Sequence, residues 1–262
     1  MLIFLDLDGT VLGPNGISPA VANAAKAARD AGFLLSVCTG RPRGGVAQTI
    51  AQSFGAGPHI FENGAMIAAP TGRPEVLESL PQSVALSLAR HARDVEAVLE
   101  FYTPAGVFVS RYNTDCEEHE QILGIRVEEA DLEDVARQRP IMRAHWIMRP
   151  LTRHAALALD LDEVEVGEAT SPVLPGMLFA SITPQGVSKG TAVAWVAAHH
   201  GVELADCVGV GDAPGDRPML DAVGHPYVMG NAPPELHRDY PVLPSVELDG
   251  VATLLNRFLE AK

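Results

Sequence analysis

Residues 1–13 read MLIFLDLDGTVLG, and this stretch decides the fold class. Residues 2–5 form a short apolar run that is typical of a strand buried within a sheet. Asp6 and Asp8 follow, separated by one residue, and a Gly-Thr pair comes directly after them. Because side chains alternate along an extended chain, both carboxylates are expected to project from one face, close together. Two like charges at the end of the most hydrophobic strand indicate that chemistry takes place at this strand end.

Strand and helix signals alternate at both ends of the chain, which is the rhythm of a parallel sheet with right-handed crossovers. Ser18-Pro19 begins an alanine-rich helical segment, and Gly32 ends it. Further strands are predicted at FLLSVCTGR (33–41), 58–61, DCVGVGD (206–212) and HPYVMGN (225–231). Helices are predicted over 43–53, over 188–200 and at the C-terminus.

The pattern changes between these two parts. Residues 83–93 have a helical pattern, and VLEFYT (98–103) and GVFVSRY (106–112) are predicted strands joined by a short turn. A helix, a strand at HWIMR (145–149), another helix and two more strands follow. Short turns between adjacent strands indicate an antiparallel sheet with helices on one side. The sequence therefore predicts an α/β core, 1–80 and 184–262, with an α+β unit at 81–183 inserted into it.

Polar residues stand at the C-terminal ends of three predicted strands. They are Asp6 and Asp8, Thr39 and Gly40, and Asp212 with Asp216. In an open parallel sheet ligands bind at the carboxyl ends of the strands. These residues are therefore expected to meet in one crevice.

Close carboxylates repel each other unless a cation neutralises them. Asp6 and Asp212 offer the hard oxygen ligands that suit Mg2+, which leaves Asp8 free to exchange a proton. Lys189 stands near the start of a predicted helix and brings a positive charge, while Thr39 offers a hydroxyl and following backbone N–H groups. Together these residues predict a phosphate site with a nucleophile inside it.

Four stretches, in this order, resemble the four motifs of the haloacid dehalogenase-like (HAD) phosphatase superfamily. They are DLDGT (6–10), the strand end at Thr39, Lys189 in GVSKG (186–190), and GDAPGD (211–216). The insert lies between the second and third motifs, which resembles the C2-capped subclass IIB group of Cof-like and sugar-phosphate phosphatases. ENGA (62–65) and GNAP (230–233) strengthen that placement. The resemblance implies a HAD-like Rossmannoid core with a parallel sheet, and an inserted C2-type cap domain.

The resemblance also implies a role for each matching residue. Asp6 would attack the phosphoryl group and form an aspartyl-phosphate, and Asp8 would act as general acid and then as base. The residues implied to bind substrate phosphate are Thr39, Gly40, Lys189, Asn63 and Asn231. The two asparagines are equally well explained as turn formers. Those implied to bind Mg2+ are Asp6, Asp8 through its main-chain carbonyl, Asp212, and Asp216 as support for the metal or for Lys189.

The predicted function is Mg2+-dependent hydrolysis of a small phosphorylated metabolite, such as a sugar phosphate, with the insert as a substrate-selecting lid. Two alternatives stay open: a phosphomutase or phosphotransferase of the same fold, and a phosphometabolite-binding module with weakened catalysis. The second alternative rests on Gly215, which stands where the group's GDxxND motif has asparagine. Polar residues of the insert could face the substrate or be structural: Arg111, Tyr112, His145 and Arg149.

Composition narrows the class of partner. The 262 residues carry a net charge of −14, which argues against binding to nucleic acid or to an anionic membrane. No run approaches the length of a membrane helix, and the N-terminal run is broken by Asp6, unlike a signal peptide. Cys38 and Cys207 lie in apolar strand-like runs and are expected to be buried, reduced thiols. We expect a cytoplasmic protein, monomeric or a small homo-oligomer, with a small-molecule substrate.

Overall fold

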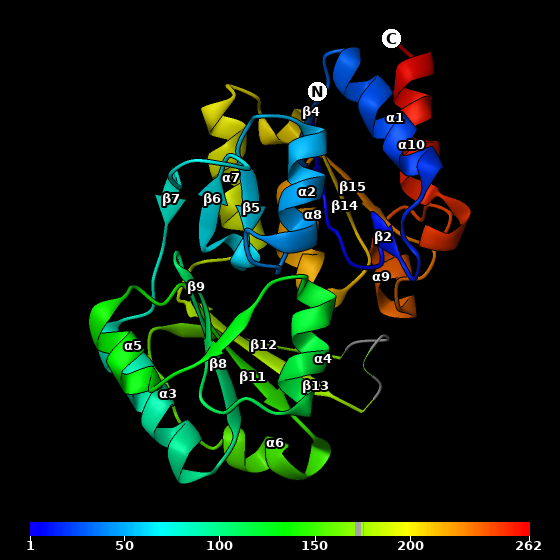
Figure 1. Ribbon diagram of the computed structural model, residues 1–262. Coiled ribbons are helices and arrows are strands. Elements are labelled where there is room, and N and C mark those ends of the chain that lie inside the picture. Colours follow the sequence, from blue (N-terminus) through cyan, green and yellow to red (C-terminus); the bar gives the residue numbers. More distant parts are fainter. Residues whose placement is uncertain (171–173, 175) are drawn as a thin grey trace. The chain divides into compact units, whose positions relative to one another are not determined.

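The protein is described by a computed structural model that covers residues 1–170, 174 and 176–262. The chain divides into two compact units, Met1–Val76 with Ser188–Lys262, and Leu77–Val187. Both ends of the chain build the first unit, and the second is inserted between them (Figure 1). The predicted boundaries differ from these by four residues at each junction, 80 against 76 and 184 against 188.

The first unit contains a sheet of four parallel strands in the order β15-β14-β1-β4. They are β1 (Leu2–Leu5), β4 (Leu34–Val37), β14 (Cys207–Gly211) and β15 (His225–Val228). Every residue of β1 is buried, which explains its unbroken apolar run. Leu5 is level with Val37 on one side and with Val210 on the other. The residues that follow these three strands therefore emerge at the same edge of the sheet.

Helices cover both faces of this sheet. The longer ones are α1 (Pro19–Asp30), α2 (Gly45–Phe54), α7 (Lys189–His199), α8 (Arg217–Ala222), α9 (Pro234–Asp239) and α10 (Gly250–Glu260). Single 3-10 turns are η1 (Glu62–Gly64), η2 (Leu204–Asp206), η3 (Pro214–Asp216) and η4 (Val246–Leu248). Apolar residues of α7, α8 and α9 pack with Leu2 and Phe4 on one face, whereas α1 packs against α10, α2 and β4. Helix α1 begins as predicted, with the Ser18 hydroxyl accepting a hydrogen bond from Val21 N.

Two small sheets lie in the first unit, except that Leu77, which ends one of them, already belongs to the second unit. Strands β2 (Leu12–Gly13) and β3 (Gly16–Ile17) form a hairpin, and β5 (His59–Phe61), β6 (Met66–Ala68) and β7 (Val76–Leu77) form a three-stranded sheet. The expectation that 58–61 continues the parallel sheet holds only in part, because a single parallel bridge, Cys38 to Ile60, joins them. The chain reverses directly after β5, where Asn63 is left-handed (φ 57°), and β5 instead pairs antiparallel with β6.

The second unit is a six-stranded sheet in the order β10-β9-β8-β11-β13-β12. Its strands are β8 (Val98–Thr103), β9 (Gly106–Val109), β10 (Val127–Glu129), β11 (Arg143–Met148), β12 (Val164–Thr170) and β13 (Leu178–Pro184). Its helices are α3 (Gln82–Asp94), α4 (Thr114–Leu123), α5 (Leu132–Gln138) and α6 (Pro150–Ala156). The α+β class of the insert agrees with the prediction.

Two details of that prediction are wrong. The sheet is not wholly antiparallel, because α4 crosses over between β9 and β10 and these two strands run parallel. Helices also lie on both faces: Leu99 and Phe101 pack with α3 and α5, while Val98 and Tyr102 pack with residues of α4. All six residues of β8 are consequently buried. Strand β10 was not predicted, and one helix was expected where α4 and α5 stand, since a three-residue strand carries almost no periodic signal.

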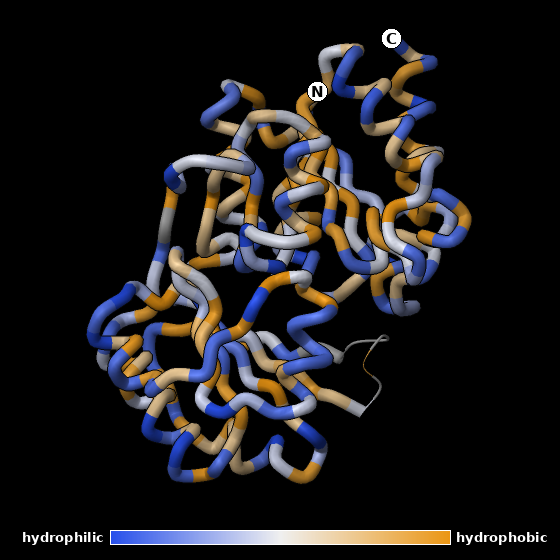
Figure 2. The backbone as a smooth tube through the Cα atoms, viewed as in Figure 1, coloured by the Kyte–Doolittle hydropathy of each residue, from blue (hydrophilic) through white to orange (hydrophobic). Residues whose placement is uncertain are grey.

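The hydropathy of the backbone follows this layering. In Figure 2 the helices α1 and α10 alternate hydrophilic and hydrophobic residues, as expected for helices with one buried face.

Within the described residues, no helix has both the length and the apolar character required to cross a bilayer. Cys38, Cys116 and Cys207 are buried and free, which agrees with the prediction for Cys38 and Cys207.

Candidate active site

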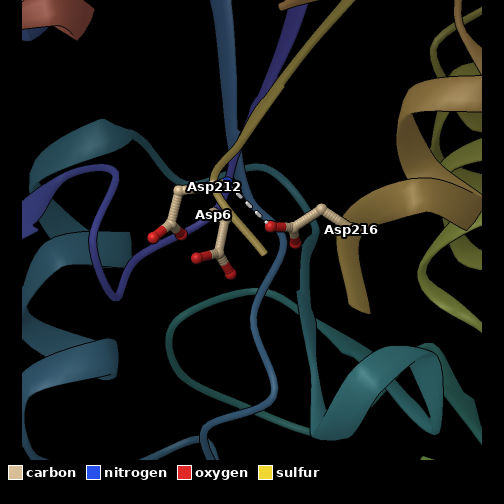
Figure 3. A group of neighbouring side chains, drawn as sticks. All are labelled: Asp6, Asp212 and Asp216. Atoms are coloured by element: carbon tan, nitrogen blue, oxygen red, sulfur yellow. Dashed lines mark hydrogen bonds between the residues drawn. The ribbon is translucent and has the colours of Figure 1, made fainter. Parts of the chain in front are cut away.

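Three carboxylates meet at the carboxyl edge of the parallel sheet. Asp6 follows β1, Asp212 follows β14, and Asp216 ends η3. One oxygen of each lies within 4.8 Å of the others, and Figure 3 shows the three side chains turned toward a common space. Asp6 and Asp216 are buried, while Asp212 is half-buried. Asp6 is held by the sheet itself, since its backbone N donates to Val210 O at 3.0 Å.

Lys189 supplies the positive charge of this cluster. Its Nζ donates to Asp6 Oδ1 at 2.6 Å and to Asp216 Oδ1 at 2.7 Å. It is the first residue of α7, where a cation opposes the helix dipole, so its place there depends on the two carboxylates. Two glycines allow other backbone segments to pack closely against the start of α7. A Cβ on Gly64 would lie 2.4 Å from Ser188 O, and a Cβ on Gly190 would lie 2.3 Å from Pro218 O.

Burial and mutual repulsion set the charge state of the cluster. Burial opposes a charged Lys189, but attraction by Asp216 and Asp6 outweighs it and holds the pKa of Lys189 well above its ordinary value. Burial and repulsion from neighbouring carboxylates raise the pKa of Asp6 well above its ordinary value, against the lowering effect of Lys189. Burial, followed by repulsion from Asp216, raises the pKa of Asp212 to about 7. One ammonium cannot balance three ionised carboxylates, so a proton or a second cation is needed when all three share this space.

Asp216 is occupied by hydrogen bonds on both oxygens. Oδ1 accepts from Lys189, and Oδ2 accepts from the backbone N of Asp212 at 2.9 Å and of Ala213 at 3.0 Å. The loop closes tightly, because a Cβ on Gly211 would lie 2.5 Å from Asp216 Cγ. Asp216 therefore anchors both Lys189 and the loop that carries Asp212.

The Asp8 carboxylate is not part of this group of three, although it is near enough to help raise the pKa values of Asp6 and Asp212 by repulsion. Its side chain is 58% exposed, and Arg41 binds it through two hydrogen bonds, Nε to Oδ2 at 2.8 Å and Nη2 to Oδ1 at 2.7 Å. Arg41 itself is buried. The counter-ion of Asp8 is therefore this arginine. From the sequence, Arg41 was expected to be a surface or supporting residue; the signal for its role was its position two residues after Thr39.

Thr39, Gly40 and Asn63 form a compact turn after β4. Thr39 is buried, and its hydroxyl accepts from Arg41 N at 3.1 Å while its carbonyl accepts from Asn63 N at 3.1 Å. A Cβ on Gly40 would lie 2.8 Å from Asn63 Oδ1, so a larger residue there would have to displace the Asn63 side chain. Asn63 adopts the left-handed conformation, as expected of a turn former.

Two polar residues bind Asp212 directly. Asn231 Nδ2 donates to its Oδ2 at 3.1 Å, and Thr10 Oγ1 approaches its Oδ1 at 3.4 Å. Gly9 presses against the same carboxylate, since a Cβ there would lie 2.1 Å from Oδ2. Gly215, by contrast, has open space around it, with nothing within 4 Å of an added Cβ.

The polar residues singled out in the insert find partners within their own unit. His145 is buried and stacks on His119 with ring centroids 5.5 Å apart, and Arg149 forms an ion pair with Asp115. Burial, Arg143 and His119 hold the pKa of His145 well below its ordinary value. Arg111 and Tyr112 contact glutamates, Arg111 Glu96 at 3.8 Å and Tyr112 Glu120 at 3.5 Å. Each of the four therefore has a partner within the second unit.

The sequence of the whole chain was compared with models of known protein families. The family model of the haloacid dehalogenase-like hydrolases matches residues 3–255. The chain belongs to this family. The resemblance drawn from the four motifs and the prediction of an enzyme with this fold are thereby confirmed.

Relatives and solved structures extend the likeness over the whole chain. HMP-PP phosphatases of Yersinia pestis and Yersinia pseudotuberculosis are 26% and 27% identical to it, across 99% of this chain and 96% of each relative. A haloalkanoate-superfamily phosphatase from Bacteroides thetaiotaomicron has a TM-score of 0.81 at 23% identity, covering 98% of this chain and 94% of that one. A HAD subclass IIB sugar phosphatase has a TM-score of 0.83 at 19% identity, covering 98% of both chains. At these identities the two structures establish a shared fold.

Proposed function

We propose that the protein is a Mg2+-dependent phosphomonoester hydrolase that forms an aspartyl-phosphate on Asp6. The observation that carries the proposal is the cluster of Asp6, Asp212 and Asp216 around the ammonium of Lys189. Family membership and the names of the relatives support the same chemistry. Residues 81–183 are proposed to form the substrate-selecting cap.

The carboxylates fit a hard divalent cation. Asp6 and Asp212 present oxygens close together, and the excess negative charge of the cluster is what such a cation neutralises. We propose that Asp6, Asp212 and the main-chain carbonyl of Asp8 hold Mg2+, while Asp216, already bound on both oxygens, supports them. When bound, Mg2+ withdraws negative charge from the phosphoryl group.

In the first step a carboxylate oxygen of Asp6 attacks phosphorus and the bond to the leaving alcohol oxygen breaks. Asp8, protonated from solvent at its exposed position and released from the ion pair with Arg41, gives its proton to that oxygen. Lys189 stands beside the nucleophile and stabilises the phosphoryl oxygens as charge shifts onto them. The hydroxyl of Thr39 and the backbone N–H of Gly40 are proposed to bind the same oxygens.

In the second step a water molecule attacks the aspartyl-phosphate. Asp8, now ionised, accepts the proton of the water, and the acyl–phosphate bond breaks to release inorganic phosphate and free Asp6. Two hydrogen bonds from the planar guanidinium of Arg41 fix the orientation of the ionised Asp8 carboxylate for this second transfer. Arg41 is thus part of the proposed machinery.

The substrate class is a small phosphorylated metabolite, with sugar phosphates as the first candidates. HMP-PP belongs in the same panel, because the curated relatives are named for it. The test measures inorganic phosphate released from this panel with MgCl2, with EDTA, and by the Asp6→Asn and Asp8→Asn variants. Asp30→Asn is the matched control, since that carboxylate pairs with Lys26 on the surface of α1.

We expect Mg2+-dependent release that Asp6→Asn abolishes and Asp30→Asn leaves unchanged. Release that survives Asp6→Asn would refute the aspartyl-phosphate. Transfer of phosphate to a second sugar without free phosphate would favour a phosphomutase or phosphotransferase. Binding without turnover for every compound would favour a phosphometabolite-binding module.

A further inference from the structure

Asn231 joins three separate segments of the first unit through its side-chain amide. Its Nδ2 donates to Gly9 O at 2.9 Å and to Asp212 Oδ2 at 3.1 Å, and its Oδ1 accepts from Val246 N at 2.9 Å. These partners lie in the loop after β1, the loop after β14 and η4. A turn former would bond to its own neighbouring backbone, whereas Gly9 is 222 residues away in the chain.

The hydrogen-bond chemistry fixes which way this amide points. A backbone N–H can only donate, so the atom that faces Val246 N is the amide oxygen. The NH2 group then faces Gly9 O and the Asp212 carboxylate, both of which accept. Both hydrogens of Nδ2 are used in this way, and none is left to donate to a substrate phosphate. This geometry speaks against the phosphate contact expected from the sequence.

Asp212 is meanwhile constrained from several sides. Its backbone N is held by Asp216, Oδ2 is bound by Asn231 and packed against the backbone of Gly9, and Thr10 approaches Oδ1. Asn231 is the member of this set that ties the carboxylate to the chain around residue 9. It therefore limits rotation of the Asp212 side chain.

We infer that Asn231 is a positioning residue that orients Asp212 for the divalent cation. The inference rests on the proposed function, because it assigns Asp212 as a cation ligand. Groups that hydrogen-bond to ligating carboxylates strengthen metal binding, and their removal commonly weakens it by about 10- to 100-fold. The substrate itself does not enter this effect.

The test is a calorimetric titration of Mg2+ into the full chain without substrate, for wild type, Asn231→Ala and Asn231→Leu. Leucine keeps a similar volume without any hydrogen bond, which separates lost packing from lost orientation. Asn113→Ala is the matched control, because it removes one amide hydrogen bond, to Cys116 N at 3.1 Å, in the other unit. We expect the Kd for Mg2+ to rise about 10-fold or more in both Asn231 variants and to stay unchanged in the control.

Kinetics on the same proteins provide an independent readout. At saturating Mg2+ both Asn231 variants are expected to recover kcat with an unchanged KM for the phosphorylated substrate. An unchanged Kd for Mg2+ with a raised KM would overturn the inference and show that the amide contacts substrate. Mg2+ binding by wild type without phosphate release, weakened in the variants, would refute the proposed function but leave this inference intact. Wild-type protein that binds no Mg2+ would overturn both.

Discussion

Replacing Lys189 by methionine tests the electrostatic core of the site. Lys189→Met keeps a long side chain at a position that is 6% exposed but removes its only charge. Asp6 and Asp216 then face each other and Asp212 without an ammonium between them. We expect the variant to be less stable and to lose at least about 100-fold in phosphate release.

The magnitude follows from the distances. Each contact, at 2.6 and 2.7 Å, corresponds to an attraction of about 6 kcal/mol at an effective dielectric constant of about 20. Burying the ammonium offsets much of this attraction, and breaking a buried pair by removing one partner costs a net of about 3–5 kcal/mol. In a chain of this size that cost lowers the Tm by roughly 6–20 °C.

The assay is denaturant and thermal unfolding at pH 8 and at pH 5, with and without Mg2+. The destabilisation should be largest at pH 8 without Mg2+, because protonation or a bound cation neutralises the unpaired carboxylates. Lys26→Met is the matched control: its contact to Asp30 is also 2.6 Å, but the side chains are 67% and 51% exposed. We expect no measurable change there. Equal unfolding free energies for Lys189→Met and wild type at pH 8 would refute the ammonium's role between the carboxylates.

Two further predictions concern the family motif and pH. Gly215→Asn should fold normally, since nothing lies within 4 Å of an added Cβ. Because the amide would restore a charge-assisted contact, steady-state kinetics should show kcat/KM raised about 10-fold or more. A lower kcat/KM than that of wild type would contradict this prediction. His59 is buried, its Nδ1 accepts from Val37 N at 3.0 Å, and burial lowers its pKa from 6.5 to about 4. The unfolded chain therefore binds the extra proton, and about 3 kcal/mol of stability present above pH 6.5 should be lost as pH falls toward 4. Denaturant unfolding across this range should show a flatter profile for His59→Gln, and an identical profile would contradict the assignment.

The positions of the strand ends, and the edge of the sheet at which they meet, could be predicted from local sequence. The apolar runs of β1, β4 and β14 end in polar residues at Asp6, Thr39 and Asp212, and a parallel sheet brings such ends to one edge. Helix α1 could also be predicted from the sequence, because the residues that begin and end it, Ser18 and Gly32, are local signals. The short strand β10 and the two-sided covering of the second sheet were not, since both depend on what packs against each face.

The order and spacing of DLDGT, Thr39, Lys189 and GDAPGD determined the family from the sequence alone, because each motif is carried by consecutive residues. Only the tertiary structure decided how the polar side chains are paired. Asp8 is bound by Arg41, 33 residues away, and Asn231 reaches Gly9 across 222 residues. Such partners depend on strand register and on backbone contacts at glycines, which bring distant segments within hydrogen-bond distance. The hydropathy pattern and the composition near a residue do not indicate which distant residue strand register or a glycine contact will bring to it.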